Sequence, residues 1–115
     1  MMNNVTPLII DFDPGLDDAV CFFMILGSKK FDVLGVCPVS GNKGLEITES
    51  NALKLCELVG REDIPVLRGA SKGILKGRRT SGNVQDSNGL GRNVVLPNPT
   101  KKVEKEYAWD FVYRK

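Results

Sequence analysis

The distribution of apolar positions predicts an alternation of short strands and helices. Residues 8–12, which begin with the apolar run 8–10, are typical of a buried strand. Residues 17–26 read as a helix whose stretch 19–26 is apolar on every face. We therefore expect that helix to be covered on most of its sides. Gly27 stands where a helix C-cap is expected, and a second strand is predicted over residues 33–37, continued by Val39.

A second helix is predicted after the loop formed by residues 40–44. One apolar stripe with helical spacing runs along it, at Ala52, Leu55, Cys56 and Val59. The remaining surface is expected to carry Glu49, Lys54 and Glu57. Gly60 ends the helix, and residues 64–67 predict a short third strand. This order indicates an α/β fold, a Rossmann-like βαβαβ unit with a parallel sheet, flanking helices and right-handed crossovers.

The second half of the chain has a different character. Residues 69–99 are polar and rich in glycine, and they include the basic run 76–79. So long a stretch predicts a functional or mobile loop, with the basic run as part of its solvated surface. Residues 104–113 predict one further amphipathic helix. No repeat or linker divides the chain, so residues 1–115 are expected to form one domain.

Composition narrows the possible functions. The chain has 115 residues, 42% apolar and 26% charged, with a net charge of +2, so neither nucleic acid nor a membrane is an expected partner. Cys21, Cys37 and Cys56 form no CxxC pair and are expected to be reduced thiols in the core. The absence of histidine excludes Ser-His and Cys-His catalysis within these residues. The start of the chain shows no secretory signal, which predicts a cytoplasmic protein.

The most informative feature is a cluster of four aspartates within residues 11–18, directly after the apolar run of residues 8–10. Like charges this close repel one another unless a cation neutralises them, and hard divalent cations prefer oxygen ligands. The cluster therefore predicts a divalent metal site, with Ca²⁺ as the expected ion. The simpler alternative is that Asp17 or Asp18 only begins the following helix, where carboxylates accept bonds from first-turn N–H groups.

The turn inside the cluster explains how its acids could converge. Pro14 fixes φ and Gly15 permits a positive φ, so the chain can reverse tightly and direct Asp13 toward the start of the helix. In parallel sheets, ligands bind beyond the carboxyl ends of the strands. Both the acidic cluster and the loop 40–44 are expected there.

Several sequence segments point to one known family. They are D-x-D-P-G-x-D-D over residues 11–18, V-x-G-N-x-x-L over 39–45, N-A-L-K over 51–54, P-V-x-x-G over 65–69 and N-G-L-G over 88–91. With these segments the chain resembles the nucleoside hydrolases, also called inosine-uridine preferring nucleoside N-ribohydrolases. The first segment is highly specific, and the similarity covers nearly the whole chain.

The resemblance implies a Ca²⁺-dependent hydrolase that cleaves the N-glycosidic bond of a ribonucleoside to give free base and ribose. By the same resemblance, Asp13 and Asp18 would bind Ca²⁺, and Asp13 would also accept a proton from the attacking water. Asp17 and Asn42 would hold the ribose hydroxyls, and Asp11 would support the metal site. A ribonucleoside is thus the expected partner, and a homo-oligomer is possible.

Two features depart from the family pattern. Family members are more than twice as long, so the chain is expected to be the N-terminal portion of a truncated nucleoside hydrolase fold, with the C-terminal half absent. Such a portion would be weakly active or inactive alone. The family's H-G-x-x-G-L segment here has Gln85 at the histidine position. Gln85 could hydrogen-bond a base or sugar, but it could not act as a general acid.

Two alternatives to an active nucleoside hydrolase remain at this level. The chain could be a truncated paralogue that keeps part of the sheet and has no turnover. It could also be a haloacid-dehalogenase-like phosphatase, in which Asp11 would accept a phosphoryl group and Mg²⁺ would be the cofactor. The Pro14-Gly15 turn and the Gly41-Asn42 loop argue against the phosphatase.

Overall fold

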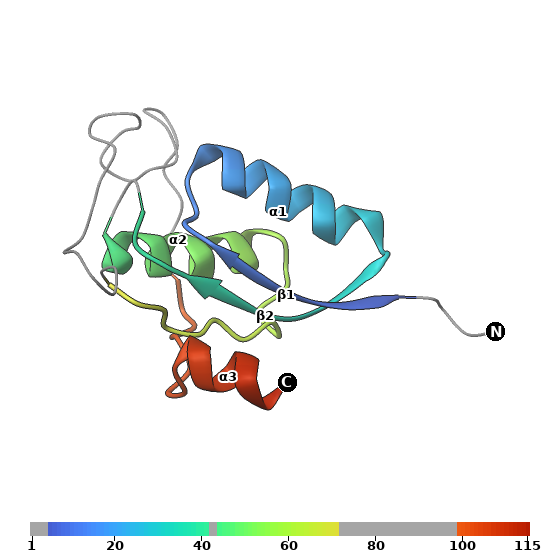
Figure 1. Cartoon of the computed structure of the whole chain (residues 1–115). Coiled ribbons are helices and arrows are strands. Elements are labelled where there is room, and N and C mark those ends of the chain that lie inside the picture. The colour runs from blue at the N-terminus through green and yellow to red at the C-terminus, as the bar shows by residue number, and fades with distance from the viewer. Residues whose placement is uncertain (1–4, 42–43, 72–98) are drawn as a thin grey trace.

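The computed structural model describes residues 5–41, 44–71 and 99–115. Its elements are strand β1 (Thr6–Phe12), helix α1 (Leu16–Ser28), strand β2 (Phe31–Pro38), helix α2 (Leu45–Leu58) and helix α3 (Ala108–Arg114). Figure 1 shows α1 and α2 on one side of the two strands and α3 on the other. The arrangement confirms the α/β fold class expected from the sequence.

The sheet is parallel, and β2 lies in its middle. β1 pairs with one edge of β2, and the segment 64–67 meets the other edge through a parallel bridge between Val36 and Val66. Val36 donates its N–H to the carbonyl of Pro65 at 3.0 Å and accepts from the N–H of Leu67 at 2.9 Å. The predicted third strand is thus present only as a short bridge, since Pro65 has no N–H to extend the ladder.

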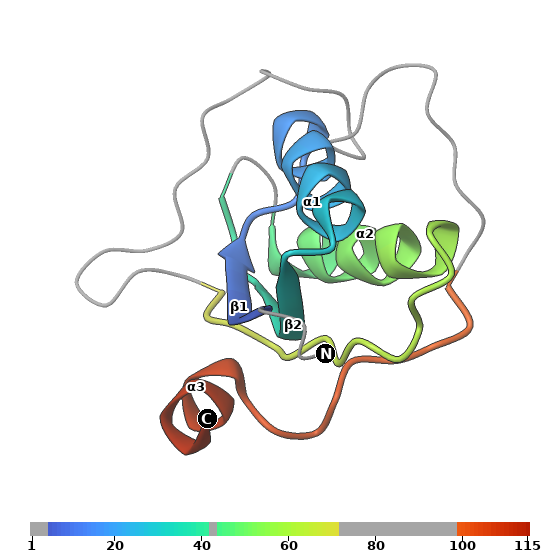
Figure 2. The same ribbon diagram turned by 90° about the vertical axis from the view of Figure 1, so that its right-hand side faces the viewer.

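Two apolar clusters cover the two faces of the sheet. The larger contains Ala19 and Phe22 of α1 together with the buried stripe of α2 and the inner side chains of β2. The smaller lies beneath α3, where Phe111 packs beside Leu67. Gly35 allows this approach, because a Cβ there would lie 2.8 Å from the Phe111 ring. Viewed along the strands in Figure 2, α3 lies on the side of the sheet opposite α1 and α2.

Helix α1 ends later than the sequence predicted. It continues through Gly27, and the left-handed residue that ends it is Lys29, with φ of 60°. Ser28 stabilises this turn by donating its hydroxyl to the carbonyl of Ile25 at 2.9 Å and accepting the N–H of Lys30 at 3.3 Å. The side chain of Ser28 thus closes the turn that Gly27 was expected to make.

The expectation that α1 is covered on most sides is not met within the described residues. Only the side bearing Ala19 and Phe22 is buried, and Val20, Cys21 and Met24 are exposed. Cys21 is therefore a surface thiol, whereas the other two cysteines are buried as predicted. In the part of the chain that the structure describes, no helix has the length and apolar character needed to cross a membrane.

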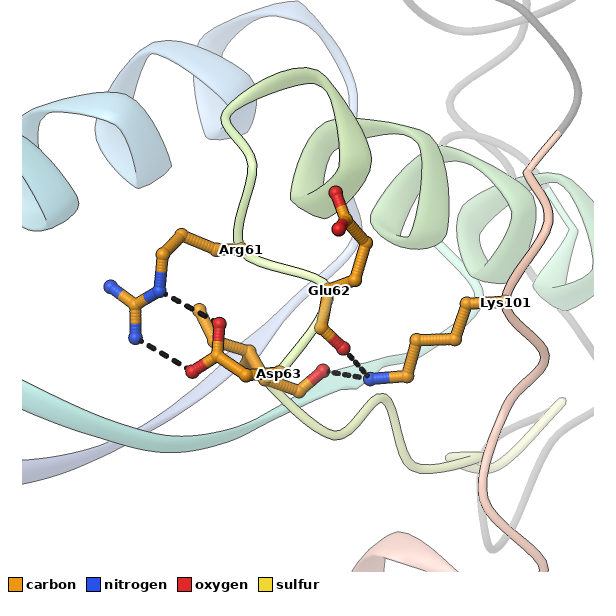
Figure 3. A network of polar contacts seen from close by, with 5 residues as sticks. Arg61, Glu62, Asp63 and Lys101 are labelled. Carbon is orange, nitrogen blue, oxygen red and sulfur yellow. Dashed lines mark hydrogen bonds and ion pairs between the residues drawn. The ribbon is translucent and has the colours of Figure 1, made fainter.

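Lys101 links the segment that begins at residue 99 to the end of α2 and to the residues that follow it. The Lys101 ammonium donates to the carbonyl oxygens of Glu62, at 2.7 Å, and Ile64 (Figure 3). The N–H of Lys101 also donates to the Glu57 carboxylate at 3.0 Å. Beside these bonds, Arg61 and Asp63 form a bidentate ion pair on the surface. Residues that are distant in sequence are thereby held beside the third segment of the sheet.

The last helix is shorter than the predicted 104–113. The N–H of Glu104 donates to the carbonyl of Val66, and the N–H of Ala108 donates to the carbonyl of Arg68, each at 2.8 Å. These bonds tie the chain to residues 66–68 on either side of a bend at residues 105–106, so α3 begins only at Ala108.

Candidate functional site

The acidic cluster lies at the edge of the sheet where β1 and β2 both end. Val39 donates its N–H to the carbonyl of Phe12 at 2.9 Å, so the chain leaves both strands at the same edge of the sheet. Beyond Phe12, the buried Pro14 and Gly15 lead directly into α1, and Gly15 is its N-cap. Gly15 is extended, with φ of −119°, so the positive φ that glycine permits is not used here.

An asparagine that the sequence reasoning missed holds this turn. Asn51 of α2 is 1% exposed, and its side-chain amide donates to the carbonyl of Pro14 at 3.1 Å. A buried amide bonded to a distant turn fixes the position of that turn relative to α2. The available signal was the N-A-L-K segment, in which a polar residue directly precedes the apolar stripe of the helix.

Asp13 and Asp18 come together across the turn. The N–H of Asp13 donates to Oδ2 of Asp18 at 3.1 Å. Burial raises the pKa of Asp18 to about 6, helped by its side-chain hydrogen bond to Asp13 and by repulsion from Asp13 and then Asp17. The fold thus holds two carboxyl groups against each other, which costs stability in the absence of a cation.

The loop after β2 presses against the same pair. A Cβ on Gly41 would overlap the carboxylate of Asp13, so only glycine fits at this position with the present geometry. The two sequence segments expected at this edge, the acidic cluster and the loop 40–44, therefore meet at Asp13.

The other predicted site residues are less closely gathered. Asp11 is exposed and pairs with Cys37 in the sheet register. The pKa of the Cys37 thiol is raised to about 11, first by burial of the thiol and second by the negative charge of Asp11. Asp17 is exposed in the first turn of α1, where it borders an apolar groove on that helix. Asn42 and Gln85 lie outside the described residues.

The chemistry of the pair fits part of a calcium site. Asp13 and Asp18 offer carboxylate oxygens, the ligands that Ca²⁺ prefers, and their mutual repulsion would be relieved by a cation. In residues 5–41, 44–71 and 99–115, no group of three or more His, Cys, Asp or Glu side chains is close enough to hold a metal. Since Ca²⁺ takes six to eight oxygens, these two residues supply only a portion of its shell.

A second missed feature is a half-buried ion pair beside a cavity of about 520 Å³ at the start of α2. Glu49 is 6% exposed, and both of its carboxylate oxygens accept bonds from Arg68, at 2.8 and 3.1 Å. The sequence prediction that Glu49 lies on the polar surface of the helix was wrong. Its spacing of three residues from Ala52 and seven from Cys56 places it on the buried stripe, which was the available signal.

The comparisons with known proteins establish the family. Residues 8–115 match the family model described as inosine-uridine preferring nucleoside hydrolase. The chain belongs to this nucleoside hydrolase family. Its members include uridine nucleosidase 1 of Arabidopsis thaliana, which is 38% identical over 109 residues that make up 94% of this chain and 32% of the plant protein.

Two further nucleoside hydrolases illustrate the range of the family. The pyrimidine-specific ribonucleoside hydrolase RihA of Shewanella woodyi is 40% identical over 82% of this chain and 30% of its own length. The solved structure of a purine-preferring ribonucleoside hydrolase from Gardnerella vaginalis superimposes with a TM-score of 0.88 at 31% identity, covering 95% of this chain and 35% of that one. The chain thus spans about a third of the length of the nucleoside hydrolases that it matches.

Proposed function

We propose that this chain supplies the N-terminal part of a Ca²⁺-dependent nucleoside hydrolase, which cleaves the N-glycosidic bond of a ribonucleoside to free base and ribose. The observation that carries the proposal is the meeting of Asp13, Asp18 and Gly41 at one edge of the sheet, in a chain of this family. The paired acids give the family signature a physical purpose, because their repulsion favours cation binding.

The proposed roles are those that the resemblance to the nucleoside hydrolases implies. Asp13 and Asp18 hold Ca²⁺, and a carboxylate oxygen of Asp13 accepts a proton from the attacking water. The cation supplies positive charge that makes water easier to deprotonate and can hold sugar hydroxyls. Asp18 has a pKa of about 6 in the structure, so it is mostly ionised at neutral pH and ready to act as a ligand.

The other candidate residues are proposed to act on the sugar or to support the site. Asp17 and Asn42 bind ribose hydroxyls, which positions the anomeric carbon for attack. The negative charge of the cluster stabilises the oxocarbenium-like transition state expected for glycosidic cleavage. Asp11 supports the cluster from the strand, and Gln85 contacts the base or sugar without donating a catalytic proton.

Activity is proposed to need more polypeptide than these 115 residues. Asp13 and Asp18 provide too few oxygens for the full coordination shell of Ca²⁺, and the relatives are about three times as long as the matched region. Alone, the chain is therefore expected to bind Ca²⁺ weakly and to turn over slowly or not at all. The named relatives include uridine, pyrimidine and purine enzymes, so the family does not assign a base preference.

Release of base from inosine and uridine, with and without a calcium chelator, tests the proposal. The assay compares the wild type with Asp13→Asn in this chain and in the same chain joined to any downstream reading frame. The control is Asp110→Asn, the same chemical change at an exposed position on α3. We expect chelation and Asp13→Asn to abolish the turnover of the extended chain. Turnover that survives Asp13→Asn would contradict the role of that residue.

A catalytically silent paralogue is the second candidate, favoured by Gln85 at the position of the family's histidine. It predicts Ca²⁺ binding without base release, even when the rest of the fold is supplied. The phosphatase alternative gains no support from the family match, and beryllium fluoride binding at Asp11 is its test.

A further inference from the structure

Asn51 is a polar residue among the buried apolar residues of α2. It is 1% exposed, and the following Ala52 is buried to the same degree. A buried amide costs stability unless it is hydrogen-bonded, so a residue of this kind needs a partner. One partner lies 37 residues away, where the amide nitrogen of Asn51 is 3.1 Å from the carbonyl oxygen of Pro14.

Thr48, a neighbouring polar residue of α2, satisfies its polar group differently. Thr48 is also 1% exposed, and its hydroxyl donates to the carbonyl of Leu45 in the same helix at 3.0 Å. Asn51 instead reaches out of the helix, to the turn between β1 and α1. The bond of Asn51 therefore links two parts of the fold, whereas that of Thr48 stays within one helix.

Pro14 is the point at which this link has most effect on the turn. It is buried, and it stands between Asp13 and Gly15, the N-cap of α1. The proline ring fixes φ, so the main remaining backbone rotation at this residue is ψ, which sets the direction of the carbonyl. A bond that holds the carbonyl therefore fixes the angle between the end of the strand and the start of the helix.

Both acids of the candidate metal site are attached to this fixed point. Asp13 directly precedes Pro14, and Asp18 lies in the first turn of α1. The N–H of Ala19 donates to the carbonyl of Gly15 at 2.9 Å, which joins that first turn to the residue after Pro14. Gly15 has no side chain with which to hold the start of the helix, so a restraint from another element is needed.

The restraint acts against a repulsion. The N–H of Asp13 donates to Oδ2 of Asp18 at 3.1 Å, although two carboxylates at this range repel each other. Asn51 holds the turn from α2, whose buried residues belong to the larger apolar cluster. The acids are thereby fixed relative to the core of the fold and not only to each other.

We propose that Asn51 is a positioning residue for the candidate metal site. By holding the Pro14 carbonyl, its amide keeps Asp13 and Asp18 close enough to bind one cation. Groups that orient metal ligands without touching the metal contribute to its affinity, and their loss typically weakens binding by about 10- to 100-fold. The consequence for calcium rests on the proposed function, whereas the effect on the turn does not.

Hydrogen exchange of the chelator-treated chain tests the effect on the turn. Asn51→Leu keeps much of the side-chain volume but removes the donor. We expect the Asp13 amide to exchange about tenfold faster than in wild type, because its bond to Asp18 is formed less of the time. The amide of Leu55, in the core of α2, reports on opening of the whole fold and should change less. The matched control, Thr48→Val, removes a buried polar group of the same helix and should leave exchange at Asp13 unchanged.

Calcium titration, followed by the NMR signals of the Asp13 and Asp18 amides, tests the consequence for the metal. Asn51→Leu should raise the Kd for calcium by about tenfold or more, and Thr48→Val should leave it unchanged. Asn51→Ser is the second variant, to be used if leucine prevents folding. Its side chain is too short to hold the Pro14 carbonyl, so it should repeat both effects.

The outcomes separate this proposal from the proposed function. A wild type without a calcium response would contradict the calcium site, and exchange at Asp13 would still decide the role of Asn51. Unchanged exchange at Asp13 in Asn51→Leu would overturn the proposal, and so would unchanged affinity where the wild type binds calcium. Equal acceleration at Asp13 and Leu55 would also overturn it, as would unfolding of both Asn51 variants beside a folded Thr48→Val, because Asn51 would then serve the fold as a whole.

Discussion

The N–H of Asp13 lies 3.1 Å from Oδ2 of Asp18, so the end of β1 and the first turn of α1 are joined by a direct hydrogen bond. The bond brings the two carboxyl groups into one small volume, where burial and repulsion raise the pKa of Asp18 to about 6. This relationship makes the cluster responsive to a cation, and it gives the first prediction.

Calcium should stabilise the wild-type chain and not the Asp18→Asn variant. A ligand at about ten times its Kd adds about 1.4 kcal/mol, which raises Tm by roughly 5 °C for a domain of this size. Asn keeps an acceptor for the Asp13 N–H but removes a repelling charge, so the variant should be slightly more stable than wild type without calcium. Thermal unfolding with Ca²⁺ or chelator measures both effects, with Asp110→Asn as the control. An equal calcium shift in Asp18→Asn would contradict the prediction.

Gly41→Ala should remove the calcium response, and its effect on the stability of the fold should be smaller than its effect on calcium binding. The added methyl group would overlap the Asp13 carboxylate and displace it. Gly27→Ala is the matched control, because a Cβ at this helical position meets nothing within 4 Å. That control should stabilise the chain by about 0.5–1 kcal/mol through reduced backbone freedom, and its calcium response should equal that of wild type. Calcium titration of both variants, followed by thermal unfolding, distinguishes the two changes.

The three cysteines should differ in reactivity. Cys21 is exposed on α1, whereas Cys37 and Cys56 are buried and burial raises the pKa of each thiol to about 11. The thiolate is the reactive form, so only Cys21 should react rapidly with Ellman's reagent at pH 8. One thiol per chain should react before unfolding, and three should react after it. Cys21→Ser should eliminate the rapid phase. Rapid reaction of more than one thiol in the folded wild type would show that the core is open.

The buried thiols also predict an alkaline limit to stability. Each pKa rises from 9.0 in the unfolded chain to about 11 in the fold, so the folded state retains protons that the unfolded state loses. Their contribution is therefore fully present below pH 9 and is lost as the pH rises through 11. Urea unfolding between pH 8 and pH 11 should show a decline that is smaller in Cys56→Ala than in wild type. Equal slopes would contradict this origin.

Breaking the Glu49–Arg68 pair should cost more than breaking the surface pair Arg61–Asp63. Arg68→Ala leaves a buried carboxylate without its partner, and because Arg68 is half exposed we expect a loss of about 1–3 kcal/mol. Arg61→Ala breaks an exposed bidentate pair and should cost less than about 1 kcal/mol. Urea unfolding of the two variants compares them. Equal losses would mean that water solvates Glu49 once Arg68 is removed.

Local sequence patterns were sufficient to predict most of the helices and strands of the fold. The apolar run after the N-terminus predicted β1, and the helical spacing of Ala52, Leu55 and Cys56 predicted α2, because strands and helices repeat with fixed periods. Their ends were less predictable. Lys29 replaced Gly27 as the left-handed residue because a serine side chain closed the turn, and the helix predicted from residue 104 began later because that segment bonds to distant residues.

By itself, the sequence determined that four acids cluster at the end of the first strand and that the chain is of the α/β class. Only the tertiary structure decided that Asp13 and Asp18 meet, that Gly41 presses on Asp13, and that Glu49 is buried against Arg68. It also decided that β1 and α1 keep uncovered apolar surface. The reason is physical: periodicity records which side of an element is apolar, whereas these contacts depend on how distant elements pack and on which surfaces they leave open.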